Sequence, residues 1–286
     1  MNKRVNIINK KLAFSLAGNP NIAFDQIEIL KRSKKNKTIS SIFPIKKIPR
    51  KIRIIIKNDL KKIVLKRKSI LGLDLNKPKI MGILNITPDS FSDGGLFLKE
   101  SKALKQAKVM LDSGAAIIDI GGESTRPGSK TINENKEWLR VKKIIIKLKK
   151  KIPKILLSLD TRKSYVMKMG FKSGINIIND ISGLNFDGKS FEIISSNKIP
   201  LVLNHSQGIP STMQKKPKYA NVLLDIYDFF DKKINLLSNS KYKKKLIIID
   251  PGIGFGKNLN HNLQILSKIS LFHSLGCPIL IGTSRK

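Results

Sequence analysis

Little in this sequence can form a covalent cross-link or a membrane span. The 286 residues include one cysteine, Cys277, which excludes a disulfide within the chain and favours a reducing compartment. No apolar run approaches the ~18 residues of a membrane span, and the first residues lack an apolar block followed by a cleavage site of small residues. The composition therefore predicts a cytoplasmic protein that has no membrane partner.

Acidic and aromatic residues are also scarce. The chain has 20 Asp and Glu against 56 Lys and Arg, a net charge of +36 that is typical of nucleic-acid-binding proteins. The basic residues are spread over the whole length, however, and four Tyr and one Trp leave few rings for stacking on bases. We therefore favour compositional drift, with no nucleic-acid partner, although nucleic-acid binding stays open as an alternative.

Two regions of the sequence differ in composition. Residues 1–68 form a Lys-rich extension without a cluster of catalytic residue types, and the sequence assigns it no role. Residues 69–75 (SILGLDL) predict a short strand that leads into a turn at residues 76–78. From about residue 79 onward Gly and acidic residues become frequent, so we expect a second domain over residues 69–286.

Short apolar runs recur in this second domain and alternate with stretches suited to helices. Continuous rather than alternating apolarity indicates strands that are buried on both faces. Residues 99–112 followed by Gly114 are typical of a helix and its C-terminal cap. The pattern predicts βα units with a parallel sheet. The apolar runs are 80–85, 115–122, 154–160, 175–180, 200–205, 245–250 and 278–282.

Nearly every one of these runs ends in a hydrogen-bonding residue. Many strand ends converge on one place in a closed (β/α)8 barrel, whereas an open doubly wound sheet gathers its functional residues at a switch point. We therefore expect an α/β protein with a TIM barrel; seven runs imply that the closing βα unit is lacking. The strand-end residues are Asn85, Asp119, Asp160, Asn179, His205, Asp250 and the group 284–286.

Glycines and carboxylates near the strand ends allow several interpretations. The spacing of Gly in DPGIGFGK (250–257) fits neither a dinucleotide fingerprint nor a Walker A loop, and predicts instead a turn close to a flat ligand. Phe255 in this turn either stacks on a ring or belongs to the core. Asp160 or Asp250 alone is most simply a helix cap. Together with Asn179 in one barrel mouth, they predict a site that reads paired N–H groups of a heterocycle.

Two long loops after strands are rich in Gly, Pro, Ser and Asp. They are NITPDSFSDGG (85–95) and GGESTRPGS (121–129), and such loops form lids, anion sites or plain surface turns. Thr125 and Arg126 suit a phosphate, and Asn85 offers an oxygen ligand for Mg²⁺. The three His residues lack zinc-site spacing, and Cys277 lacks a catalytic partner pattern, which argues against a zinc or nucleophilic enzyme.

Together these segments resemble dihydropteroate synthase, a family of pterin-binding barrels. MGILNITPDSFSDGG (81–95) and GAAIIDIGGESTRPGS (114–129) look like its two signatures, and the resemblance covers about residues 69–286. Shorter segments match in order: LDT (159–161), IIND (177–180), HSQGIPSTMQ (205–214), DPGIGFGKN (250–258) and SRK (284–286). Methyltetrahydrofolate-dependent methyltransferase domains share the barrel but not the two signatures, and remain an alternative, as does a nucleic-acid-binding protein on an inactive barrel.

The resemblance implies a transferase of folate biosynthesis. It would join 4-aminobenzoate to 6-hydroxymethyl-7,8-dihydropterin diphosphate, giving 7,8-dihydropteroate and diphosphate, with Mg²⁺ as cofactor and a homodimer as assembly. Asp160, Lys286 and Arg126 would be the catalytic residues. The implied contacts are Asp160, Asn179, Asp250, Gly282 and Lys286 for the pterin; Asn85 and Thr125 for the diphosphate, with Asn85 also for the metal; and Arg126, Pro127, Phe255 and Ser284 for the aminobenzoate.

The chain departs from the family pattern in three places. Asn204 and Ser206 flank His205 where the family has methionines, which puts a polar residue where a thioether would pack against the pterin. The extension of roughly 65 residues is longer than the usual lead-in. The family also continues past SRK through the closing strand, which carries an Arg and a His on the diphosphate side. We therefore expect poor activity and marginal stability of the 286-residue form.

Overall fold

The strands of the second domain form one parallel sheet. The computed structural model describes residues 12–33, 37–87, 96–124, 129–208, 212–214 and 216–283, the side chains of 96–99 excepted. The sheet has six strands in chain order: β5 (Ile80–Asn85), β6 (Ala115–Gly121), β7 (Leu157–Asp160), β8 (Ile177–Asp180), β9 (Leu201–Asn204) and β10 (Ile247–Asp250). A doubly wound sheet would reverse its strand order at a switch point, and this sheet does not. The expected barrel architecture is therefore confirmed.

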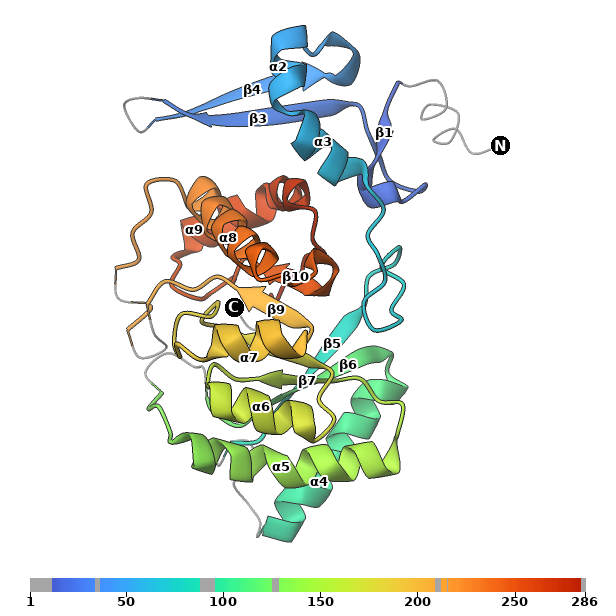
Figure 1. The fold of residues 1–286 in the computed structure, drawn as a ribbon, viewed down its shortest axis with the longest axis vertical. Coiled ribbons are helices and arrows are strands. Elements are labelled where there is room, and N and C mark those ends of the chain that lie inside the picture. Colours follow the sequence, from blue (N-terminus) through green and yellow to red (C-terminus); the bar gives the residue numbers. More distant parts are fainter. Residues whose placement is uncertain are drawn as a thin grey trace.

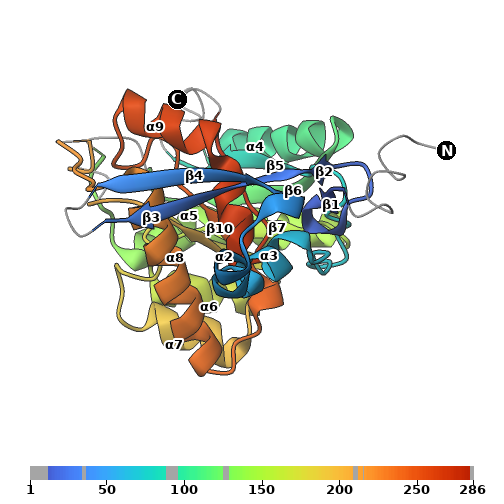
Figure 2. The ribbon, with the colours of Figure 1, turned by 90° about the horizontal axis from the view of Figure 1, so that it is seen from above.

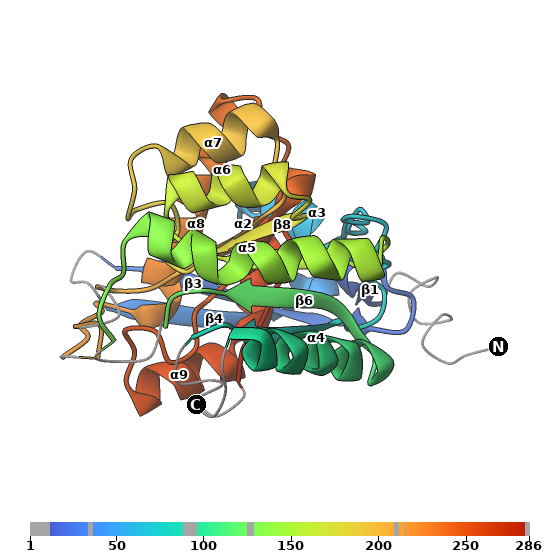
Figure 3. The ribbon, with the colours of Figure 1, turned by 90° about the horizontal axis from the view of Figure 1, so that it is seen from below.

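A helix follows each strand and covers the outside of the sheet, as Figures 1 and 3 show. The expected helix at 99–112 is part of α4, and Gly114 follows it with a φ of 97°, as a C-terminal cap requires. The helices are α4 (Leu96–Asp112), α5 (Glu134–Lys151), α6 (Ser164–Lys172), α7 (Ser190–Asn197), α8 (Val222–Asn239) and α9 (Leu259–Ser267). No helix of the described part is long and apolar enough to cross a membrane.

The seventh apolar run lies beside β10. Ile279 forms a parallel bridge with Ile249, whose N–H donates to the carbonyl of Pro278 at 3.0 Å. The N–H of Leu280 donates in turn to the carbonyl of Ile249 at 2.8 Å. Within the described residues no strand ladder joins this run to β5, so the cylinder has an unpaired seam there.

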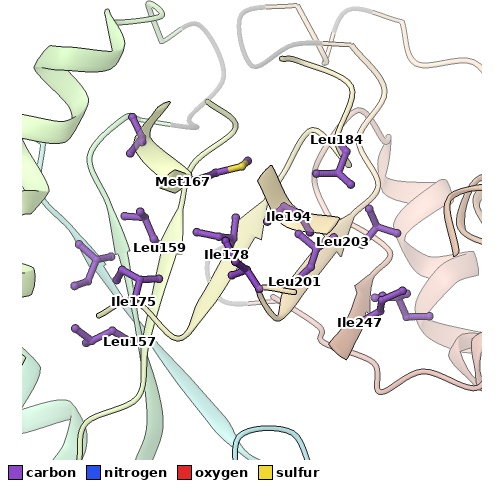
Figure 4. Close-up of a cluster of buried hydrophobic side chains, with 14 of the residues drawn as sticks. Leu157, Leu159, Met167, Ile175, Ile178, Leu184, Ile194, Leu201, Leu203 and Ile247 are labelled. Atoms are coloured by element: carbon purple, nitrogen blue, oxygen red, sulfur yellow. The ribbon is translucent and has the colours of Figure 1, made fainter. Parts of the chain in front are cut away.

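Alternate residues of each strand pack into two separate layers. Leu159, Ile178 and Leu203 face the helices and belong to the main core, as Figure 4 shows. Ile177 and Val202, one residue away, face the barrel interior and join a second cluster. This alternation follows from the period of two along a strand. The place of a residue in this alternation therefore shows whether its side chain faces the barrel interior.

A tight turn closes the amino-terminal end of the barrel. Ile70 is 2% exposed and packs with the inward-facing cluster, together with Leu73 and Leu75. The chain reverses at Leu71 and Gly72, whose φ angles are 52° and 79°. The prediction of a strand over 69–75 is therefore wrong, because two consecutive left-handed residues form a hairpin turn instead.

The Lys-rich extension is folded. Its elements are β1 (Phe14–Ser15), β2 (Ala23–Phe24), β3 (Gln26–Arg32), β4 (Thr38–Pro44), α2 (Arg50–Ile55) and α3 (Lys57–Val64). β1 pairs with β2 and β3 with β4, both antiparallel. In Figures 1 and 2 the β3–β4 hairpin and both helices lie over the α8 and α9 side of the barrel.

Ion pairs attach this extension to the barrel. The guanidinium of Arg32 contacts Asp225 at 2.6 Å and also Asp228, both on α8. The ammonium of Lys268 contacts the Glu28 carboxylate at 2.6 Å. Helix α3 also packs against the 3-10 helix η5 (Ile269–Leu275). Ion pairs between oppositely charged side chains therefore link the extension to the barrel.

Candidate active site

Four residues are aligned across neighbouring strands at the carboxyl end of the barrel. Asn85 pairs with Gly121, Gly121 with Asp160, and Asp160 with Asn179. A Cβ atom on Gly121 would lie 3.0 Å from Asn85 Oδ1 and 3.6 Å from Asp160 Oδ2. The amide and the carboxylate therefore converge over a position that lacks a side chain.

Asn179 and two residues of other strands, Asp250 and Gly282, face the same interior, whereas the predicted strand-end residue His205 packs against Phe229 on α8. Asn179 follows Ile177 by two residues, and Asp250 follows Ile248 by two; Ile177 and Ile248 both belong to the inward-facing cluster. The period of two therefore turns Asn179 and Asp250 inward as well. Gly282 follows Leu280, which packs on this cluster, in the same way.

Asp119, one of the predicted strand-end residues, joins this group, although the sequence analysis assigned it no ligand contact. It lies two residues before Gly121, and its Oδ2 accepts a hydrogen bond from Asn179 Nδ2 at 2.9 Å. Burial raises the pKa of Asp119. Burial, and then the charge of Asp119, raise the pKa of Asp160 well above its usual value. Its spacing of two from Gly121 places Asp119 on the inward face of β6.

Several inward-facing oxygens are buried without a donor. Asp119 Oδ1, Asn179 Oδ1 and Asn204 Oδ1 have no hydrogen-bond partner within the described residues. Buried polar atoms in proteins are nearly always paired, so such a group marks the place of a ligand. The ligand must supply N–H groups to these acceptors, as a flat heterocycle with ring and exocyclic N–H groups does.

The glycine-rich loop after β10 packs against the end of β9. Gly252 N donates to Asp250 Oδ1 at 2.8 Å, and a Cβ on Gly252 would lie 2.0 Å from the carbonyl oxygen of His205. Helix α6 has Lys163 at its N-cap position and α9 has Asn258. The interpretation of Asp160 and Asp250 as helix caps is therefore wrong, because neither occupies that position.

A buried lysine joins the loops that follow β9 and β10. Lys257 Nζ lies 3.0 Å from the carbonyl of Phe255 and 3.1 Å from both His205 Nδ1 and the carbonyl of His205. Burial lowers the pKa of Lys257 to about 7 and that of His205 to about 3. His205 is therefore neutral at physiological pH, and its ring packs edge-on against Phe229. No group of three or more His, Cys, Asp or Glu that could hold a metal occurs in the described part.

A buried ion network holds the base of the loop after β6. Glu123 Oε1 accepts from Lys163 Nζ at 2.9 Å and from the N–H of Ile132 at 2.8 Å. Glu123 Oε2 accepts from Arg162 Nε at 3.1 Å, and Lys163 also contacts Glu137. Glu123 and Ile132 flank residues 124–131, so the network joins both ends of this loop. Sequence reasoning missed it because its members are spread over three elements.

The structure brings together Asn85, Asp160, Asn179 and Asp250 from the predicted site. Phe255 lies in the loop after β10, where its carbonyl accepts from Lys257. Gly282 lies on the seventh run, with open space around the position of a Cβ. The remaining predicted site residues, Thr125, Arg126, Pro127, Ser284 and Lys286, lie outside the described residues.

Comparison with known proteins agrees with this geometry. The model of the pterin-binding enzyme family matches residues 81–286. Dihydropteroate synthase of Escherichia coli strain K12 is 42% identical over 215 residues, which are 75% of this chain and 76% of that protein.

Two solved structures are similar to the whole barrel region. The Yersinia pestis dihydropteroate synthase with a sulfonamide drug complex has a TM-score of 0.69 and 43% identity, covering 75% of this chain and 77% of that one. The Xanthomonas albilineans dihydropteroate synthase with 4-aminobenzoic acid also has a TM-score of 0.69, with 36% identity over 75% of this chain and 76% of that one. The chain therefore belongs to the pterin-binding enzymes and, within them, to the dihydropteroate synthase family.

Proposed function

We infer that this chain condenses 6-hydroxymethyl-7,8-dihydropterin diphosphate with 4-aminobenzoate, the reaction of dihydropteroate synthase in folate biosynthesis. The observation that carries this inference is the aligned row from Asn85 to Asn179, together with the buried acceptors without donors in and beside it. A pterin ring has N–H groups that can donate hydrogen bonds to these acceptors.

Asp160, Asn179 and Asp250 are proposed to bind the pterin ring, with Gly282 below it and Lys286 beside it. The amide of Asn179 is oriented by its hydrogen bond to Asp119, which leaves Asn179 Oδ1 free to accept from the ring. The N–H of Gly252 holds the carboxylate of Asp250. Side chains that are fixed before the ligand arrives lose little entropy on binding it.

Asn85 and Thr125 are proposed to hold the diphosphate. The side chain of Asn85 makes no hydrogen bond within the described residues and is exposed at the mouth, so its oxygen is available to a cation. Mg²⁺ commonly takes one or two protein oxygens and completes its shell with substrate phosphates and water, which fits this single amide. When bound there, Mg²⁺ would neutralise charge on the leaving diphosphate.

In the reaction the C–O bond between the pterin methylene and the diphosphate breaks, and the electron pair leaves with the diphosphate oxygen. The amine of 4-aminobenzoate supplies the electron pair of the new C–N bond and loses one proton. Asp160, in its ionised form, would stabilise the positive charge that develops on the pterin methylene, and Arg126 the negative charge on the leaving group. Because burial raises the pKa of Asp160, hydrogen bonds from the N–H groups of the bound ring must favour the ionised form. Pro127, Phe255 and Ser284 are proposed to hold the aminobenzoate. No protein nucleophile is needed.

Two solved structures of one relative support the assignment of substrates. The Xanthomonas albilineans enzyme binds 4-aminobenzoic acid, and the same enzyme has been solved with 7,8-dihydropteroate. By the same family likeness we propose a homodimer in the cytoplasm, with small-molecule substrates and without a nucleic-acid partner.

Conversion of radiolabelled 4-aminobenzoate to dihydropteroate by the purified chain tests this function. Asp160→Asn should lower kcat at least about 100-fold, because a neutral amide cannot stabilise the developing positive charge. Asp112→Asn, on the exposed end of α4, serves as the control and should leave turnover unchanged. Binding of methyltetrahydrofolate without binding of 4-aminobenzoate would contradict the proposal and favour methyl transfer.

A further inference from the structure

Asn204 occupies an inward-facing position at the end of β9. It follows Val202, a member of the inward-facing cluster, by two residues, and it lies directly opposite Asp250 in the register of β9 and β10. Its side chain is therefore on the same face as the carboxylate that we assign to the pterin. It is also almost fully buried, at 2% exposure.

The amide of Asn204 is left without a partner. Its Oδ1 is buried and makes no hydrogen bond within the described residues. Gly252 lies close by, since a Cβ on this glycine would be 2.8 Å from this oxygen. The N–H of Gly252 already donates to Asp250 Oδ1, and the N–H of His205 donates to the carbonyl of Asp250 at 2.9 Å. The donors at this junction are thus engaged elsewhere.

Ser206, the second polar residue beside His205, behaves differently. Its hydroxyl donates to the carbonyl of Ile181 at 2.9 Å, so it is paired inside the protein. This hydrogen bond gives Ser206 a structural role, whereas the buried oxygen of Asn204 forms no hydrogen bond within the described residues. A buried polar side chain that faces a ligand cavity and lacks a partner indicates that the ligand supplies one.

We propose that Asn204 is an additional pterin-recognition residue, whose side-chain amide forms a hydrogen bond with the polar edge of the pterin ring next to Asp250. This inference rests on the proposed function. A thioether at this place would contact the ring without regard to its donors and acceptors. An amide rejects rings whose edge cannot form the hydrogen bond, because its own polar atoms would stay unpaired.

Isothermal titration with 6-hydroxymethyl-7,8-dihydropterin tests this proposal. Asn204→Leu, close to asparagine in shape, should weaken pterin binding about 5- to 20-fold, the effect of losing one buried hydrogen bond. Its thermal midpoint without ligand should stay the same or rise, because a buried unpaired polar atom is removed. Asn204→Met serves as a second variant with the same expectation, and KM for 4-aminobenzoate should not change.

Ser206→Ala is the matched control. It should lower the thermal midpoint, because the hydrogen bond to Ile181 is lost, and leave pterin affinity unchanged. Pterin affinity of the Asn204 variants equal to that of the wild type would overturn the proposal, as would a loss of affinity that merely follows a lowered midpoint. If the wild type itself does not bind the pterin, the proposed function fails instead, so the two failures are distinguishable.

Discussion

Lys257 places a positive charge at 3% exposure among neutral acceptors. Its three hydrogen bonds go to the imidazole of His205 and to the carbonyls of His205 and Phe255. A buried ammonium without a direct carboxylate partner loses most of its hydration, and burial accordingly lowers the pKa of Lys257 to about 7. Burying this charge therefore costs free energy. The hydrogen bonds of Lys257 hold together the loops that follow β9 and β10.

This pKa predicts how stability depends on pH. The folded protein releases the Lys257 proton near pH 7, while the unfolded chain keeps it up to about 10.4. Between these values the unfolded state binds more protons, so the contribution of Lys257 to the free energy of unfolding should rise with pH. We expect the wild type to gain stability relative to Lys257→Met from about pH 7 to about pH 10, as measured by urea unfolding.

The exposed Lys168 on α6 provides the control for this measurement. Lys168→Met should give a curve of stability against pH that runs parallel to that of the wild type. Parallel curves for Lys257→Met as well would show that Lys257 titrates as an ordinary lysine and would contradict the expectation.

At the scale of elements, the base of the loop after β6 depends on a buried network of four charges. Glu123 and Glu137 face Arg162 and Lys163, and none of the four is more than 8% exposed. The network connects β6, α5 and the segment after β7. It fixes both ends of the loop that we propose to carry contacts to the diphosphate and the aminobenzoate.

Removing one charge from this network should be strongly destabilising. Glu123→Gln leaves two buried cations against a single carboxylate, so we expect a loss of about 3–5 kcal/mol in the free energy of unfolding. The exposed ion pair of Asp112 with Lys108 offers a comparison, because Asp112→Asn should cost no more than about 0.5 kcal/mol. Denaturant unfolding of both variants measures the difference, and equal losses would refute the role of burial.

Local patterns made the elements of the barrel predictable, while contacts distant in sequence were not. The continuous apolar runs and Gly114 identify strands and a helix end, because burial on both faces and a left-handed cap each demand particular residues. The turn at Leu71 and Gly72 was mistaken for a strand, since apolar residues there pack on the barrel floor rather than in a sheet. The pairing of Glu123 with Arg162 depends on tertiary packing that spacing alone does not encode.

At the scale of the whole molecule, some of the scarce acidic residues lie where the extension meets the barrel and form ion pairs there. Glu28, Asp225 and Asp228 are three of only 20 acidic residues in the chain. The hydrogen bond from Lys268, foremost, lowers the pKa of Glu28. These pairs are half-exposed, so each is worth little alone, and salt weakens them.

Reversing one of these pairs tests how the extension is held. Glu28→Lys should weaken its attachment by about 0.2–1 kcal/mol or somewhat more, because attraction becomes repulsion with Lys268. The double variant with Lys268→Glu should restore it. Limited proteolysis of the β3–β4 hairpin at low and high salt measures the attachment, and equal cleavage of the single and double variants would contradict this picture.

The small turn at Leu71 and Gly72 covers the amino-terminal end of the barrel. Ile70, Leu73 and Leu75 pack against the inward-facing cluster from its lower end, and this cluster fills the barrel below the strand-end residues. A ligand can therefore reach the strand-end residues only from the carboxyl end of the barrel. A shortened chain that begins at Ile80 would lack this cover, and water would reach the lower side of the inward-facing cluster.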